Sequence, residues 1–231
     1  MSGIDKIDTL RQTELFRELD DAALESLAAH AVEKKLAKDE LLFIAGERAR
    51  GLFVIAEGSV RAFRTGADGR EQIIHVERAV TTIAEVPVFD DGDHPSTAAA
   101  EEPSVVLFIR AADIRSVSIR HPQLALSAAK LLAGRLRKCA ELVEALSLRE
   151  VGQRVAMQFL AEAASRGVET PRGICFDLKI THNQLAARIG TVREVVTRAV
   201  TRLQAQGLVV VDGRRVTIPD ASALRDYVDQ G

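Results

Sequence analysis

The chain has 231 residues, 47% of them hydrophobic, with a formal charge of −2, no Trp and one Tyr. This length allows one large or two ordinary domains, and the scarcity of aromatic residues argues against base stacking on single-stranded nucleic acid. Cys139 and Cys175 are too few for a disulfide framework or a four-thiolate cluster. Because the N-terminus lacks the features of a signal peptide and no apolar run reaches a membrane span, we expect a cytoplasmic protein with no membrane partner.

Residues 1–30 predict an amphipathic helix, and residues from about 36 to 110 predict short strands. The apolar side of the helix contains Leu15, Phe16, Leu19, Leu24 and Leu27. In the strand-rich part, β-type runs alternate with turn signals, which is typical of a small barrel or jelly roll. These runs are residues 41–44, 52–56, 60–64, 72–76 and 105–109. Residues 1–112 are therefore expected to form one domain, an N-terminal helix plus a β-roll.

The next segment, residues 113–147, predicts one long helix over 113–146 with an apolar seam. Positions spaced alternately by four and three form a coiled-coil pattern, namely Ala125, Ala129, Leu132, Leu136, Cys139, Val143 and Leu146. A second copy of the helix would cover this seam, which predicts a two-fold homodimer. Packing against the chain's own β-roll is the alternative. Residues 147–150 are the expected hinge to a C-terminal domain, residues 148–231, which opens with a helix over 151–166.

Residues 181–206 are typical of a helix, a tight turn and a second helix. Thr181 is expected to cap the first helix, and Gln184 to complete a capping box. Gly190 permits the turn because glycine adopts positive φ without strain. The second helix has an apolar side at spacings of three and four, formed by Val192, Val195, Val196, Ala199, Val200 and Leu203.

The other side of this second helix has the residue types that read DNA. Arginine bonds both acceptors of a guanine in the major groove, and a carboxylate accepts from cytosine N4. A strand–turn–strand pattern around Asp212-Gly213 predicts a wing, and residues 172–215 carry eight Arg/Lys against three Asp/Glu, a patch suited to the phosphates of double-stranded DNA. The candidate base-reading residues are Arg193, Glu194, Thr197 and Arg198, and the candidate phosphate contacts here are Arg202, Arg214 and Arg215.

With these elements in this order, the chain resembles the CRP/FNR family of transcription regulators along nearly its whole length. The matching segments are Glu57-Gly58, residues 146–151 and the second helix, whose Arg193, Glu194 and Arg198 stand at the family's base-reading positions. The resemblance implies an α+β fold: a cyclic-nucleotide-binding-type β-roll (jelly roll), a long dimerisation helix and a winged helix-turn-helix. It also implies a two-fold symmetric operator and contact with RNA polymerase.

The resemblance adds two phosphate contacts and one question about the operator. Thr181 and His182 match residues that touch phosphate, although the family often has an arginine where His182 stands. Thr197 occupies the place of a serine that alters the half-site in the anaerobic branch. Both a TGTGA-like and a TTGAT-like half-site therefore stay open.

The resemblance also marks an effector pocket in the β-roll. Its ligand-holding positions correspond here to Ala84, Glu85, Pro95, Ser96, Cys139 and Ala140. Pro95 replaces the arginine that would pair a cyclic phosphate, and both hydroxyls that would meet the purine are absent. Asp90, Asp91 and Asp93 would also repel an anion. These three differences disfavour cAMP as the effector. The N-terminal cysteines of the iron–sulfur branch are absent as well.

Residues 82–89 and 144–148 look more like the nitric-oxide-responsive haem branch of the family. Among His30, His75, His94 and His121, no spacing singles out an axial ligand. Three possibilities therefore stay open for the effector: haem, another small metabolite, or no ligand at all.

An enzyme is the rival class, for example a cupin-like metal oxygenase built on the roll. Such a site needs clustered His and carboxylate ligands, whereas His75 and His94 are nineteen residues apart. No Gly-x-Ser-x-Gly elbow marks a nucleophile either. We therefore predict no catalytic residue and no metal ligand; a DNA-binding protein that needs no ligand is the remaining alternative.

Overall fold

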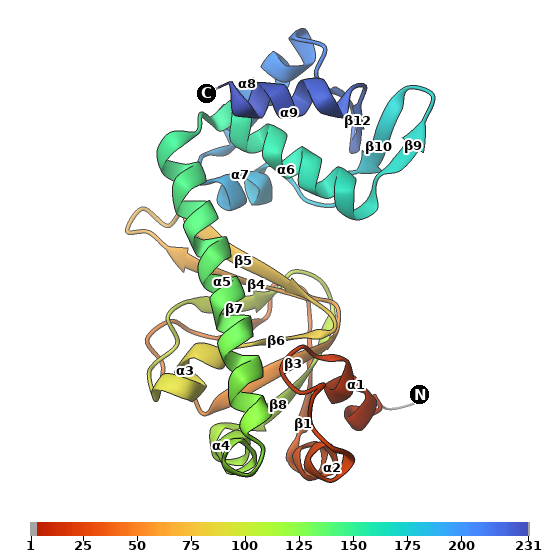
Figure 1. The fold of residues 1–231 in the computed structure, drawn as a ribbon. Helices are drawn as coiled ribbons and strands as arrows, with labels where there is room; N and C mark the ends of the chain where they lie inside the picture. The colour runs from red at the N-terminus through yellow and green to blue at the C-terminus, as the bar shows by residue number, and fades with distance from the viewer. Residues whose placement is uncertain (1–3, 231) are drawn as a thin grey trace. The chain divides into compact units, whose positions relative to one another are not determined.

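The computed structural model describes residues 4–230, so residues 1–3 and 231 of the predicted domains lie outside the described residues. The chain divides into two compact units. The first contains the residues up to Arg64 together with Ile74–Cys139, and the second contains Thr65–Ile73 and the residues from Ala140 onward. Each unit is described by itself below, with element labels as in Figure 1.

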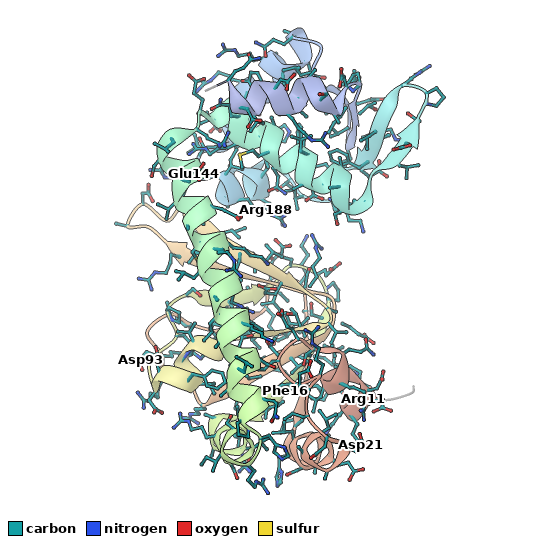
Figure 2. All side chains as sticks on the ribbon, viewed as in Figure 1. Arg11, Phe16, Asp21, Asp93, Glu144 and Arg188 are labelled. Carbon is teal, nitrogen blue, oxygen red and sulfur yellow. The ribbon has the colours of Figure 1, made fainter. Side chains whose placement is uncertain are left out.

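The N-terminal segment forms two helices where the sequence predicted one. They are α1 (Lys6–Gln12) and α2 (Asp21–His30), capped by Asp5 and Asp20. Thr13 ends α1, because its backbone is extended and its N–H and hydroxyl turn back to the Leu10 carbonyl. The predicted apolar side is nevertheless buried, including Phe16 (labelled in Figure 2). Arg11 on α1 also donates to Asp21 on α2 at 2.8 Å (Figure 2).

Two four-stranded sheets, in the orders β1-β8-β3-β6 and β2-β7-β4-β5, form the predicted β-roll. Buried side chains such as Ile55, Val60 and Val106 form a core within it. The five predicted strands are present, but three others were missed: a charged edge strand, β1; a three-residue strand, β6; and an alanine-rich one, β7. The strands are β1 (Val32–Leu36), β2 (Leu41–Phe43), β3 (Gly51–Glu57), β4 (Ser59–Thr65), β5 (Glu71–Arg78), β6 (Thr81–Ile83), β7 (Thr97–Ala100) and β8 (Ser104–Arg110).

The predicted single helix over 113–146 is also wrong, because the structure has α4 (Ala111–Arg120) and α5 (Pro122–Leu148). The break lies at His121, whose backbone is not helical. Proline has no N–H and restricts the residue before it, so Pro122 ends the preceding helix and begins the next one. In α5, Leu124, Ala128 and Leu131 are buried, and α5 continues from the first unit into the second.

The second unit contains helices α6–α9 and a four-stranded sheet in the order β11-β12-β10-β9, whose β9–β10 hairpin projects to one side (Figure 1). Its core includes Phe159 and Phe176, whose rings lie edge to face at 6.1 Å. Helix α6 has the predicted bounds, whereas β9, β10 and α9 were not predicted. The elements are α6 (Val151–Arg166), β9 (Val168–Thr170), β10 (Gly173–Asp177), α7 (His182–Ile189), α8 (Arg193–Ala205), β11 (Val210–Asp212), β12 (Arg215–Ile218) and α9 (Ala221–Asp229).

No helix in residues 4–230 is both long enough and apolar enough to cross a membrane.

Candidate functional site

Helices α7 and α8 form the helix-turn-helix that the sequence predicted. Thr181 is the N-cap of α7 and accepts a hydrogen bond from the Gln184 N–H, while the Gln184 side chain accepts from the Thr181 N–H, so the capping box is confirmed. Gly190 ends α7 with φ +68°, the left-handed conformation that favours glycine. A short turn at residues 191–192 then leads into α8.

Helix α8 presents a polar face and buries an apolar one. Val196, Val200 and Leu203 are buried, whereas the other predicted apolar positions, Val192, Val195 and Ala199, are only half-buried. The candidate base-reading residues are all exposed and lie in the first two turns of the helix, namely Arg193, Glu194, Thr197 and Arg198. A helix-turn-helix inserts this end into the major groove, so these side chains stand where they could reach base edges.

The candidate phosphate contacts lie in three places around α8. Thr181 and His182 are at the start of α7, where the His182 Nδ1 is 3.2 Å from the Thr197 hydroxyl. Arg202 is exposed farther along α8. Arg214 and Arg215 are exposed at the wing, whose β11 and β12 pair Asp212 with Arg215. The two turn residues are therefore Gly213 and Arg214, one position later than the predicted Asp212-Gly213.

Four of the six predicted effector positions come together in the β-roll. Ala84, Glu85, Pro95 and Ser96 line a small cavity of about 40 Å³. Glu85 begins α3 (Glu85–Asp90), which follows Ala84 in a left-handed conformation with φ +72°. Cys139 and Ala140 do not line this cavity; both are exposed on α5.

A cation that sequence reasoning missed, Arg135 of α5, also lines the cavity. Its guanidinium lies 3.0 Å from a Glu85 carboxylate oxygen and 3.6 Å from Glu77, and it donates to the Thr82 carbonyl at 2.6 Å. The Arg135 side chain is 17% exposed and the Glu85 side chain 0%. The two residues are fifty positions apart, and no local pattern signals this pair. The pocket thus contains a cation, paired with Glu85, although its own loop contains no Lys or Arg.

Two histidines also line this cavity, His75 on β5 and His94 in the loop before β7. Burial, and then the charges of Arg135 and Lys138, lower the pKa of His75 to about 4. Its Nε2 is buried and has no hydrogen-bond partner within residues 4–230. The imidazole is therefore neutral at pH 7.

No group of three or more His, Cys, Asp or Glu side chains in this described part of the chain is arranged to hold a metal ion.

Replacing His75 with glutamine is expected to change the pH dependence of stability. Between about pH 6.5 and 4, the unfolded chain binds a proton at His75 that the folded chain does not, so the wild type loses stability as the pH falls. The effect of one such proton is about 1.4 kcal/mol per pH unit. In urea titrations from pH 7 to 4.5, the variant should lose stability less steeply than the wild type. Equal slopes would contradict a buried, neutral His75.

Two known domain families match the chain. Residues 33–121 match the cyclic nucleotide-binding domain, and residues 153–227 match the Crp-like helix-turn-helix domain. The cyclic AMP receptor protein of Thermus thermophilus is 30% identical over 185 residues, which cover 80% of this chain and 82% of the relative. The fumarate and nitrate reduction regulatory protein of Salmonella typhimurium is 27% identical over 195 residues, covering 83% of this chain and 76% of that relative.

Solved structures share the fold at lower identity. A mutant of CooA from Carboxydothermus hydrogenoformans has a TM-score of 0.77 at 16% identity and covers 99% of this chain and 97% of its own. The c-di-GMP-responsive regulator CLP of Xanthomonas campestris has a TM-score of 0.76 at 20% identity, covering 87% of this chain and 100% of its own. These structures support the predicted architecture.

Proposed function

Because the chain belongs to the CRP/FNR family of transcription regulators, we propose that it is a cytoplasmic homodimer that reads a two-fold symmetric operator through α8. A ligand in the β-roll controls this binding, and the bound dimer contacts RNA polymerase. The family consists of DNA-binding regulators and not of enzymes. The exposed face of α8, which places two arginines and a glutamate in its first two turns, carries the proposal.

The operator is identified by selecting the purified full chain against a random double-stranded DNA library. The expected product is an inverted repeat whose half-sites are about one helical turn apart. Guanines at the positions read by Arg193 and Arg198 are expected, because arginine bonds guanine most readily. Failure to enrich any sequence would contradict sequence-specific binding. Transcription from a template with the selected site, using bacterial RNA polymerase, then measures activation or repression.

The homodimer rests on the apolar seam along α5. Leu136 is 71% and Val143 is 63% exposed, Cys139 is exposed, and Leu132 and Leu146 are half-buried. Apolar residues at these spacings are covered by a second helix in a coiled coil. The first unit covers the buried side chains of α5, including Leu131, so the alternative of packing on the chain's own roll holds for that side of the helix. Leu132 of the seam also packs against the core of the first unit, whereas Leu136, Cys139 and Val143 are exposed and available to a second helix.

Glutamates at the seam are expected to separate the two protomers. In a Leu136→Glu/Val143→Glu variant, like charges would face each other across the two-fold axis. Sedimentation equilibrium should then show a monomer, and the affinity for the full operator should fall about 100-fold because the two half-sites are no longer bound together. Ile119→Glu is the matched control, since Ile119 is 82% exposed on α4 and outside the seam. A double variant that remains dimeric would exclude this seam as the interface.

For the effector, we propose a small anionic or polar metabolite that displaces Glu85 from Arg135 and occupies the space vacated by that side chain, since the cavity alone has only about 40 Å³. An anion that binds the Arg135 guanidinium would break the ion pair between α5 and α3. A ligand that binds only when this ion pair is broken shifts the population toward the conformation without it. cAMP is disfavoured, because Pro95 stands where an arginine is needed and Asp90, Asp91 and Asp93 lie nearby. If metabolite anions shift the thermal unfolding of an Arg135→Lys variant as much as that of the wild type, this proposal fails.

Haem is a second candidate effector, because His75 has the chemistry of an axial ligand. Its buried Nε2 has no partner within residues 4–230, and a neutral imidazole is the form that binds iron. The cavity beside it, about 40 Å³, is far too small for a porphyrin, so the space does not fit haem in this conformation. Saturation at one haem per chain, followed by Soret absorbance and lost in His75→Ala, would support haem; non-saturable binding would exclude it.

A further inference from the structure

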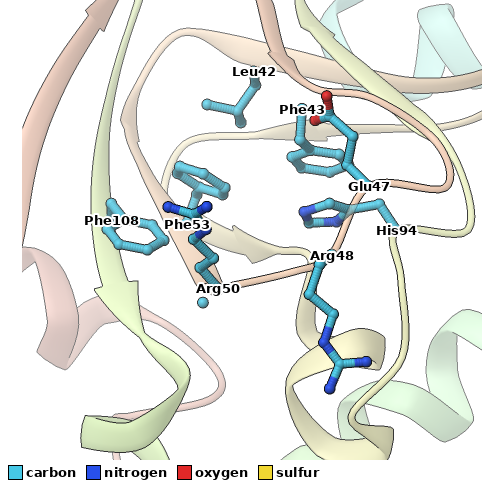
Figure 3. A pocket seen from close by; sticks show the side chains of 9 residues that line it. Leu42, Phe43, Glu47, Arg48, Arg50, Phe53, His94 and Phe108 are labelled. Atoms are coloured by element: carbon cyan, nitrogen blue, oxygen red, sulfur yellow. The ribbon is translucent and has the colours of Figure 1, made fainter.

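We propose that the β-roll contains a second ligand site, which adjoins the Glu85 cavity through Phe43 and His94 and takes a planar aromatic monocarboxylate. The site is a cavity of about 470 Å³ between β2, β3, β8 and the loop before β7 (Figure 3). This volume lies within the usual range for small-molecule sites. It is lined by Leu42, Phe43, Glu47, Arg48, Arg50, Gly51, Phe53, His94 and Phe108.

A row of aromatic rings forms one wall of this cavity. His94 stacks on Phe43 with ring centroids 3.9 Å apart and an interplanar angle of 12°. Phe43 in turn stacks on Phe53 at 5.9 Å, and Phe53 contacts Phe108 at 5.2 Å. Figure 3 shows the rings of Phe43, Phe53 and His94 along the cavity. Aromatic rings favour offset stacking with another flat ring, so the wall selects a planar aromatic ligand.

His94 keeps this wall uncharged. Burial lowers the pKa of His94, against the opposing influence of Glu47 and Asp93, so its ring is neutral at pH 7. Its Nδ1 is buried and has no hydrogen-bond partner among the described side chains and backbone. An unsatisfied buried polar atom is costly and uncommon.

Arg50 supplies the charge that would bind a carboxylate. It is exposed at the cavity, and no carboxylate in residues 4–230 pairs with it. In Figure 3 its side chain runs toward the phenyl rings, whereas Arg48 is directed away from them; Arg48 also lies 4.0 Å from Asp93. An arginine guanidinium binds a carboxylate through two parallel hydrogen bonds. Arg50 is therefore the anion-binding group of the site.

The neighbouring charges limit the ligand to a single negative charge. Glu47 lies on the His94 side of the cavity, away from Arg50 (Figure 3), and Asp93 is close to Arg48. Arg50 is thus the one lining cation without a carboxylate partner among the described residues, and Glu47 in the same lining disfavours a ligand with a second negative charge. A monocarboxylate with its ring against Phe43 and Phe53, and its charge at Arg50, matches both the wall and the charges.

The test is calorimetric titration of the full-length protein with 2-naphthoate, with the neutral alcohol 2-naphthalenemethanol as the ligand control. Saturable binding of the carboxylate, at least 10-fold tighter than that of the alcohol, is expected. Arg50→Gln should weaken naphthoate binding about 10-fold or more, since a hydrogen bond to a charged group has that effect. Phe53→Leu should weaken both ligands, because it removes a stacking ring.

Two variants act as controls, and each outcome bears on the site. Arg78→Gln changes an exposed arginine on β5 outside the cavity, and Ser96→Ala changes the neighbouring Glu85 cavity only; both should bind naphthoate as the wild type does. No saturable binding at millimolar concentration, equal binding by Arg50→Gln, or loss of binding in Ser96→Ala would each overturn the proposal. None of these results depends on DNA binding, so the two proposals fail separately.

Discussion

Replacing Arg135 with methionine is expected to lower the free energy of unfolding by about 3–5 kcal/mol. The substitution leaves the Glu85 carboxylate, whose side chain is 0% exposed, without its cation. Breaking a buried ion pair on one side costs this much because the remaining charge is then buried without compensation. Methionine replaces the unbranched aliphatic stem of arginine and lacks only the guanidinium end, so most of the loss reflects charge and hydrogen bonding. Urea unfolding of the purified protein at pH 7 measures it.

Two further variants distinguish this pair from a general effect of changing α5. Arg137→Met alters an exposed arginine two positions away and should shift stability by no more than about 0.5 kcal/mol. Arg135→Met combined with Glu85→Gln removes both charges, and the double variant should recover much of the loss, since replacing a whole buried pair is often neutral. Equal stability of Arg135→Met and Arg137→Met would show that the pair contributes nothing.

Arg198→Ala is expected to weaken binding to the selected operator by about 1–3 kcal/mol, or roughly 5- to 150-fold. The loss on random DNA of the same length should be much smaller, because base contacts supply specificity and not general affinity. Glu194→Ala should act in the same way at a neighbouring base pair. Fluorescence anisotropy with labelled operator and random duplexes, at one fixed salt concentration, measures both affinities.

Variants of one arginine in the wing and one in α9 are the controls for the Arg198→Ala result. Arg215→Ala should weaken binding to all sequences about equally and reduce the slope of log affinity against log salt by about one, as expected for a phosphate contact. Arg225→Ala, an exposed arginine on α9, should change neither quantity. If Arg198→Ala lowers operator and random-DNA affinity alike, Arg198 touches phosphate and the assignment of α8 as the reading helix is wrong.

The sequence predicted best where a repeating apolar pattern was bounded by clear end signals. For α6 the bounds were predicted to the residue, and for α7 the capping box at Thr181 and the glycine turn at Gly190 were confirmed. Strands β3, β4 and β8 were found within a few residues, because their apolar residues alternate with turn signals.

The sequence predicted poorly where a single residue or a distant contact decides the structure. Pro122 interrupts a helix whose apolar pattern continues across it. β7 consists largely of alanine, which is depleted in strands and is held there by pairing on both sides. The charges of the loop around Glu85 predict a pocket without a cation, whereas Arg135 of α5, fifty positions after Glu85, supplies one. Such pairs arise from tertiary packing and leave no local pattern.

His94 is part of the wall of both β-roll cavities, and Phe43, stacked on it, is as well. If both cavities bind ligands, a ring shared in this way links the two sites, because a ligand that turns or fixes the ring changes the shape of the other cavity. Linkage is reciprocal: whatever factor the first ligand applies to the affinity of the second, the second applies to the first. If both proposed ligands bind, the regulator therefore integrates two signals through one imidazole, and the sign of the coupling decides whether the ligands assist or oppose each other.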